Sequence, residues 1–270
     1  MPEVHATAIV HGDAEIATDV IVGPYATIGP GVRLAGGVEI GSHVVLDGDS
    51  EIGIRTRVHS FSTIGLAPQH RGDDGKAGRV VIGSDCVIRE HSTIHRGTDG
   101  GGGTTRMGDR CYLMVGSHVA HDCIVGNDVT MANNATLGGH VCLGDGVYVG
   151  GLSAVHQNLN VGRLSMIGAG IVIRRNVIPF SLIVANHNYP EGALRGPNVV
   201  GLRRKGFSRT AIRHIDATMR FLFNGRNSLG ERADEAAAKD ANDEIAQEIV
   251  AFVRNRFARG FIGADFRDGA

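Results

Sequence analysis

An aliphatic residue recurs at every sixth position over most of the chain. The repeat is unbroken over residues 4–64, returns over residues 82–94, and continues over residues 107–173. An α-helix cannot bury a stripe with a period of six, because its own period is 3.6. A parallel β-helix can, since each six-residue unit then forms a short strand and a turn, and three units complete one coil of about 18 residues. The pattern therefore predicts an all-β solenoid.

The regular repeat is interrupted twice and then ends. Residues 65–81 and 99–106 do not fit inside a coil, so we expect them to protrude as loops. Beyond Pro179 the repeat stops, and residues 186–209 are rich in turn residues and are expected to form a loop. Two later stretches, 208–225 with Ser208 as N-cap and 242–260, have helical spacing. We predict a β-helix over residues 1–185 and an α-helical domain over residues 186–270 that covers its open end.

Composition narrows the class of protein. The 40 glycines indicate many tight turns, and a net charge of −1 disfavours a general nucleic-acid binder. The N-terminal residues lack the basic and apolar regions of a signal peptide, and no stretch approaches 18 continuous apolar residues. We therefore expect a soluble cytoplasmic protein without an integral membrane segment. Cys86, Cys111 and Cys123 fall on the small inward position of the repeat and Cys142 does not, and reduced thiols are expected at all four.

The repeat also predicts which side chains share a corner of the coil. Residues 18 apart lie above one another, so His121, Gly139 and Gln157 form one column. The next column contains Asp122, His140 and Asn158, and both His118 and His156 lie nearby.

Such a cluster suits acyl transfer. A histidine removes a proton from an acceptor hydroxyl, a carboxylate stabilises the imidazolium, and a glycine N–H stabilises the oxyanion. Neither column contains a serine or cysteine nucleophile, which favours direct attack by the acceptor over an acyl-enzyme.

Two other interpretations of the histidines stay open at this stage. His118, His121 and His140 could bind zinc with water as the fourth ligand, as in the gamma-class carbonic anhydrases, which are hydro-lyases built on a solenoid. A purely structural solenoid would instead carry uniform polar faces without a histidine cluster. Because Gly138 and Gly139 serve an oxyanion hole better than a metal site, we expect no metal and no other cofactor.

Several motifs together resemble one family. They are "IHRGT" with "GGGTT", "AHDC", "NNATLGGHV", "GGLSAVHQ" and "GLRRKGFSR". The chain resembles over nearly its whole length the hexapeptide-repeat UDP-N-acetylglucosamine 3-O-acyltransferases of lipid A biosynthesis. The resemblance implies a left-handed β-helix and a homotrimer with active sites between subunits. It also implies transfer of a 3-hydroxyacyl group from acyl carrier protein to the 3-hydroxyl of the nucleotide sugar.

The resemblance assigns roles to individual residues. His121 matches the general base, Asp122 the residue that orients it, and the backbone of Gly139 the oxyanion donor. The remaining matches are expected to bind substrate: the cleft residues His118, His140, His156 and Gln157, the nucleotide residues Asn198, Arg204 and Lys205, and Gln69 in the first protruding loop.

The substrate-binding residues depart from the family pattern. His70 stands where the family commonly has a carboxylate and Gly72 where it has a lysine, and Val200 replaces a frequent glutamate. Arg174 and Arg175 lie near the expected path of the acyl chain. A paralogue that uses another amino sugar, a sugar 1-phosphate or an acyl-coenzyme A donor is therefore the alternative, and acyl chain length stays open.

Overall fold

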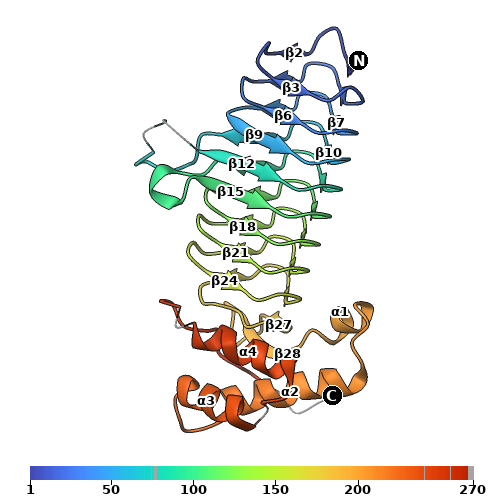
Figure 1. The fold of residues 1–270 in the computed structure, drawn as a ribbon. Helices are drawn as coiled ribbons and strands as arrows, with labels where there is room; N and C mark the ends of the chain where they lie inside the picture. The colour runs from blue at the N-terminus through green and yellow to red at the C-terminus, as the bar shows by residue number, and fades with distance from the viewer. Residues whose placement is uncertain (74, 76–77, 240, 256, 267–270) are drawn as a thin grey trace.

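The chain folds into a long stack of triangular coils with a group of helices at one end (Figure 1). The computed structural model describes residues 1–266 except 74, 76, 77, 240 and 256. Each coil contributes one short strand to each of three sheets, and every third strand along the chain is a neighbour in the same sheet.

The first sheet has 11 strands: β1 (Glu3–Val4), β4 (Ile21–Val22), β7 (Glu39–Ile40), β10 (Arg57–Val58), β13 (Val87–Ile88), β16 (Tyr112–Leu113), β19 (Thr130–Met131), β22 (Tyr148–Val149), β25 (Met166–Ile167), β27 (Ser181–Val184) and β28 (Ala193–Pro197). The second has nine: β2 (Ile9–Val10), β5 (Thr27–Ile28), β8 (Val45–Leu46), β11 (Thr63–Leu66), β14 (Thr93–His95), β17 (His118–Val119), β20 (Thr136–Leu137), β23 (Ala154–Val155) and β26 (Val172–Ile173). The third has eight: β3 (Glu15–Ile16), β6 (Arg33–Leu34), β9 (Asp49–Ile52), β12 (Arg79–Ile82), β15 (Thr104–Met107), β18 (Ile124–Val125), β21 (Cys142–Leu143) and β24 (Asn160–Val161).

Strand register confirms the six-residue interpretation of the sequence. Neighbouring strands are parallel except for β27 and β28, and in regular coils each residue pairs with the one 18 positions away, as Val119 pairs with Leu137. The aliphatic residue of each unit points inward and is buried along most of the stack. Cys86, Cys111 and Cys123 are buried in the same core, and all four cysteines are free thiols. Parallel sheets of this kind fit the expected left-handed β-helix.

Two segments leave the stack on the same side (Figure 1). Residues 67–78 lie between β11 and β12, and residues 96–103, with the 3₁₀ helix η1 (Asp99–Gly101), lie between β14 and β15. We call them the first and second excursions. Strands take up both ends of the expected range 65–81 and residues 104–106 of the second expected range, while residues 74, 76 and 77 lie outside the described residues.

The helical tail contains more structure than its sequence pattern indicated. The predicted helices are present as α2 (Arg209–Phe223) and α4 (Glu244–Arg254), and the Ser208 hydroxyl caps α2 by accepting from Ala211 N. The expectation of a loop over residues 186–209 is wrong, because β28 pairs antiparallel with β27 and Asn198 caps the short helix α1 (Val199–Arg204). Helix α3 (Leu229–Lys239) was not predicted.

The tail is attached to the last coils by an ion pair. Arg163 donates to both carboxylate oxygens of Glu248 on α4, at 2.6 and 2.7 Å. The helices therefore cover the end of the stack that follows β24 (Figure 1). Among the described residues, no helix is both long and apolar enough to cross a bilayer.

Candidate active site

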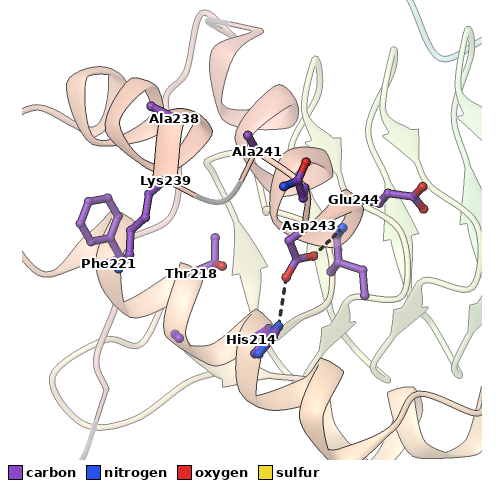
Figure 2. Close-up of a pocket in the computed structure, with 11 residues that line it drawn as sticks. His214, Thr218, Phe221, Ala238, Lys239, Ala241, Asp243 and Glu244 are labelled. Atoms are coloured by element: carbon purple, nitrogen blue, oxygen red, sulfur yellow. Dashed lines mark hydrogen bonds and ion pairs between the residues drawn. The ribbon is translucent and has the colours of Figure 1, made fainter.

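A cavity of about 850 Å³ lies in the helical tail, between α2 and the turn that precedes α4 (Figure 2). The polar groups around it have structural partners. Asp243 accepts from the backbone of Ile245 and Ala246 as the N-cap of α4, and it lies 3.1 Å from His214 Nδ1 on α2. These contacts join α2 to α4, so His214 and Asp243 have structural roles.

The histidine corners stack as the sequence predicted. His121 and Asp122 lie in the turn between β17 and β18, one coil from Gly139 and His140. The His140 N–H donates to the His121 carbonyl at 3.0 Å, and the Asn158 N–H donates to that of Gly139 at the same distance. Asp122, His140 and Asn158 all adopt a left-handed backbone, with φ near 60°. Residue types that tolerate this conformation are required here, and Asp, His and Asn are among them.

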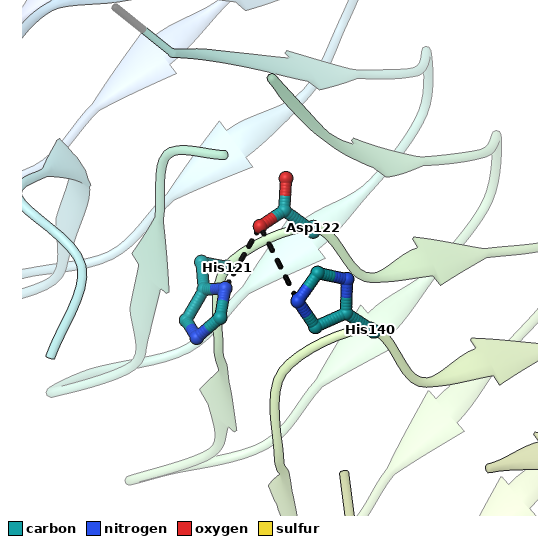
Figure 3. Close-up of side chains that lie close together, drawn as sticks. All are labelled: His121, Asp122 and His140. Carbon is teal, nitrogen blue, oxygen red and sulfur yellow. Dashed lines mark hydrogen bonds and ion pairs between the residues drawn. The ribbon is translucent and has the colours of Figure 1, made fainter. Parts of the chain in front are cut away.

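His121 and Asp122 form a hydrogen-bonded pair (Figure 3). Nδ1 of His121 lies 2.8 Å from Oδ2 of Asp122, whose side chain is completely buried. Asp122 also accepts from the Thr98 N–H at 3.0 Å and from the Thr98 hydroxyl at 2.7 Å. Its own backbone N–H donates to the Thr105 hydroxyl. The second excursion therefore supplies the groups that fix the carboxylate.

These contacts determine the charge of Asp122 and the tautomer of His121. Burial acts to raise the pKa of Asp122, but the hydrogen bonds from Thr98 and His121 outweigh it and the pKa is lowered. Asp122 is therefore ionised at neutral pH and can only accept. It follows that Nδ1 of His121 carries the shared proton and that Nε2 is free to accept one.

Gly139 packs directly against the imidazole of His121. A Cβ atom at residue 139 would lie 2.6 Å from Cε1 and 2.7 Å from Nε2 of His121, so no larger residue fits without displacing the ring. Among the described residues, the Gly139 N–H has no backbone acceptor. The residue that touches the imidazole therefore also has a backbone N–H without a backbone acceptor.

The pair faces a cavity of about 300 Å³ whose walls come from both excursions. The lining residues are His70, Gly72, Asp73, Thr98, Asp99, Gly100, His121 and His140. Gly101 allows the second excursion to approach this closely, because a Cβ there would collide with the Asp122 carboxylate and the His140 ring. The ring of His70 lies over His121, with centroids 5.4 Å apart. His140 contacts His121 edge to face at 5.1 Å.

The other predicted cleft histidines lie at different depths. His118 is half-buried, its Nδ1 lies 2.6 Å from the Thr93 hydroxyl, and its ring meets that of His95 edge to face at 4.9 Å. Burial, followed by the charges of His95 and His121, lowers the pKa of His118 to about 4, so this histidine is neutral at pH 7. His156 lies one coil beyond His140, with its Nδ1 3.2 Å from the Gln157 carbonyl oxygen. The Gln157 side chain is exposed.

The predicted nucleotide-binding residues do not reach this cavity within one chain. Asn198 is buried, where it caps α1 and donates to the Leu164 carbonyl at 3.0 Å. Lys205 lies 3.7 Å from Asp128, on another corner of the coil, and Arg204 is exposed at the end of α1. Gln69 is exposed on the first excursion and does not line the cavity.

The side chains that come closest to a metal site differ from the predicted trio. Ligand atoms of His121, Asp122 and His140 lie within 4.8 Å of one another, whereas His118 is outside the group. The 2.8 Å contact between His121 and Asp122 is a hydrogen bond, and Oδ2 of Asp122 already accepts from Thr98. A metal would have to displace a proton and compete with these donors.

Four residues near the site had no role in the sequence interpretation: His95, Thr98, Gly101 and Thr105. The motif "IHRGT" with "GGGTT" contains all of them, but the six-residue period does not extend through the second excursion. Their contacts with Asp122 and His118 follow from the path of that segment back to the coil, which no periodicity encodes.

Comparisons with known proteins agree on one kind of relative. A family model described as Udp N-acetylglucosamine O-acyltransferase, domain 2, matches residues 176–262, and a model of bacterial transferase hexapeptide repeats matches residues 104–139. The acyl-[acyl-carrier-protein]–UDP-N-acetylglucosamine O-acyltransferase of Caulobacter vibrioides is 45% identical over 251 residues, covering 93% of this chain and 94% of that protein. Its namesake from Syntrophobacter fumaroxidans is 42% identical and covers 98% of both. The solved UDP-N-acetylglucosamine acyltransferase from Campylobacter jejuni superposes with a TM-score of 0.89 at 33% identity, covering 97% of this chain and all of that one.

Proposed function

The chain belongs to the UDP-N-acetylglucosamine O-acyltransferase family, and from this premise we propose that it moves an acyl group from an acyl-carrier-protein thioester to the 3-hydroxyl of UDP-N-acetylglucosamine. The observation that carries the proposal is the pair of His121 and ionised Asp122, 2.8 Å apart, in which His121 lines a cavity and packs against Gly139. The names of the relatives support acyl carrier protein and UDP-N-acetylglucosamine as substrates. The geometry of His121 and Asp122 supports general-base catalysis.

In the proposed reaction Nε2 of His121 removes the proton of the sugar 3-hydroxyl while its oxygen attacks the thioester carbonyl. Asp122 stabilises the imidazolium through Nδ1, and the Gly139 N–H donates to the oxyanion. Collapse of the tetrahedral intermediate breaks the carbon–sulfur bond and forms the ester. The departing thiolate takes the proton from His121, which returns the base to its starting state.

We further propose that the complete site forms between subunits of a homotrimer. The cavity of one chain contains the reacting groups, whereas Asn198, Arg204 and Lys205 lie on a different part of that chain. A neighbouring subunit would bring these residues to the nucleotide. His118, His140, His156 and Gln157 would then line the cleft for the sugar and the acyl chain.

No metal or other cofactor takes part in the proposed reaction, since the acceptor hydroxyl is activated by His121. The grouping of His121, Asp122 and His140 makes a zinc-dependent hydro-lyase the second candidate. Metal analysis of the purified protein distinguishes the two. One tightly bound zinc per chain, lost together with activity on chelation, would favour the hydro-lyase.

The acceptor itself has a close alternative, because His70 and Val200 stand where the family has carboxylates. Loss of one hydrogen bond to a charged group lowers affinity roughly 10- to 150-fold. A paralogue that accepts a sugar 1-phosphate or another amino sugar would tolerate these changes. Mass spectrometry of products from a panel of UDP-sugars and sugar phosphates, each with acyl-carrier-protein and coenzyme A thioesters, identifies the acceptor, the donor and the new bond.

The role of His121 is tested by His121→Ala. Loss of the general base should lower kcat by roughly 10²-fold or more. Circular dichroism should show the same fold, because the aliphatic core is untouched, while the melting temperature should fall by only a few degrees through loss of the hydrogen bond to Asp122. His11→Ala, at an exposed position in the first coil, is the matched control. Near-normal turnover in folded His121→Ala protein would remove the mechanism.

A further inference from the structure

The first excursion contributes His70, Gly72 and Asp73 to the wall of the cavity. His70 reaches over His121 from this segment, and the Asp73 N–H donates to the His70 carbonyl at 3.0 Å. The two residues therefore move together as one turn. Whatever fixes Asp73 also fixes the imidazole that faces the base.

Asp73 is held by an ion pair from the second excursion. Nη2 of Arg96 donates to Oδ2 of Asp73 at 3.0 Å, and the two side chains are only 13% and 10% exposed. Among the described residues, most other ion pairs lie on the surface, as Arg55 and Asp85 do at 64% and 40% exposed. A shielded pair is screened less by water and salt, so this contact holds the wall more firmly than a surface pair would.

The path of the Arg96 side chain is equally restricted. Its backbone N–H donates to the Leu66 carbonyl at 3.2 Å, at the point where the first excursion begins. Its Cδ passes Gly78, where a Cβ would lie 3.3 Å away and would also collide with the Gly97 carbonyl. Glycine at residue 78 therefore leaves room for the arginine to pass between the bases of the two excursions.

We propose that Arg96 and Asp73 form a positioning pair that holds His70 over His121, so that the acceptor pocket is assembled before the acceptor binds. The inference rests on the proposed acyltransferase function. Arg96 acts only through Asp73 and the turn, and Thr98, two residues further on, holds Asp122. The same short segment thus fixes both the catalytic carboxylate and the opposite wall.

The pair should affect binding of the acceptor more than the chemical step. Without one partner, the remaining charge would be shielded and unpaired, and the turn would move outward until water solvates it. His121, Asp122 and Gly139 would stay in place, since their contacts come from the coil and Thr98. We expect acceptor KM to rise roughly 10-fold or more in Asp73→Asn and Arg96→Gln, with kcat changed less than about threefold.

The experiment measures KM for UDP-N-acetylglucosamine and kcat at saturating acyl-carrier-protein thioester. The acceptor KM of the double variant should be no higher than that of the more impaired single variant, because both substitutions remove the same contact. Arg71→Gln is the matched control, since Arg71 is exposed on the same segment and does not line the cavity. Unchanged KM in both single variants, additive effects in the double variant, or a loss confined to kcat would overturn the proposal.

Hydrogen exchange separates this inference from the proposed function. The Asp73 amide, which donates to the His70 carbonyl, should exchange at least about tenfold faster in Asp73→Asn than in the wild type, while amides of α2 keep their rates. This readout needs no turnover. If the wild-type protein acylates no UDP-sugar, the proposed function fails, but hydrogen exchange still tests the positioning role of Arg96 and Asp73. Equal exchange rates in the wild type and the variant would refute that positioning role and leave the proposed function standing.

Discussion

The substitution Gly139→Ala tests whether the position of the His121 ring limits the reaction. The new methyl group would lie 2.6 Å from Cε1 of the imidazole, well inside the 3.4 Å of ordinary contact. Gly139 does not have a positive φ, so alanine fits the backbone and the N–H stays where it is. The change therefore moves the base while keeping the oxyanion donor.

The expected loss follows from the size of that movement. The ring must shift by roughly 0.8 Å to restore ordinary contact, and its tether to Asp122 allows this only if Nε2 turns away or the 2.8 Å hydrogen bond lengthens. A misplacement of about 1 Å in a reacting group lowers the rate by about 10²-fold. We expect kcat to fall roughly 10- to 100-fold, which raises the activation free energy by about 1.4–2.7 kcal/mol.

Thioester release at saturating substrates measures kcat, and urea unfolding measures stability. Gly12→Ala is the control, because a Cβ at residue 12 meets nothing within 4 Å. Gly138→Ala is the contrast, since its Cβ would lie 2.8 Å from the backbone nitrogen of Gln157 and should lower stability instead. Wild-type kcat in folded Gly139→Ala protein would refute the reasoning that the ring must stay against residue 139.

Two further predictions concern stability. The lowered pKa of Asp122 stabilises the fold above its unfolded pKa, near 3.9, and this contribution is lost as pH falls through the folded value. Thr98→Val should therefore lower the free energy of unfolding by about 1.5–3 kcal/mol at pH 7 and by less as the pH falls below the unfolded pKa, and an equal loss at pH 7 and pH 3 would contradict this. Phe61→Ala should cost about 1–3 kcal/mol in urea unfolding without changing activity, because Phe61 stacks between His43 and His91 at 5.0 and 5.1 Å. Leu152→Ala, at an exposed corner with the same left-handed backbone, is its control, and equal losses in the two variants would mean that the stack contributes nothing.

The sequence predicted the solenoid because its structure repeats in one dimension. A fixed period places His121 above Gly139 without knowledge of any other contact, and the paired strands have that register. The inward cysteines follow from the same rule, since Cys86, Cys111 and Cys123 occupy the small position of the repeat.

What the sequence did not predict depends on contacts outside the repeat. Thr98 reaches Asp122 across 24 positions, by way of a segment with no period. Strand β28 forms by pairing with β27, and Asn198, the N-cap of α1, donates to the Leu164 carbonyl at the end of the solenoid. The turn-rich composition of this segment does not predict these contacts. In the zinc alternative His118 would have joined His121 and His140 as a ligand, but its Nδ1 is turned toward Thr93 on the preceding coil.

The strand register restricts how the length of this protein can change during evolution. Loss or gain of six residues within the coil between β15 and β17 would carry His121 to another corner, away from both excursions. Loss or gain of 18 would keep the corner but change its height in the stack. Each excursion leaves the stack and returns to it at the next strand, so its length can change without shifting the strand register. Paired residues that flank the excursions are accordingly separated by 30 positions (Ile64 and Ile94) and by 25 positions (Ile94 and Val119) instead of 18. Insertions and deletions should therefore collect in the excursions and the tail, while the coils vary only by whole turns.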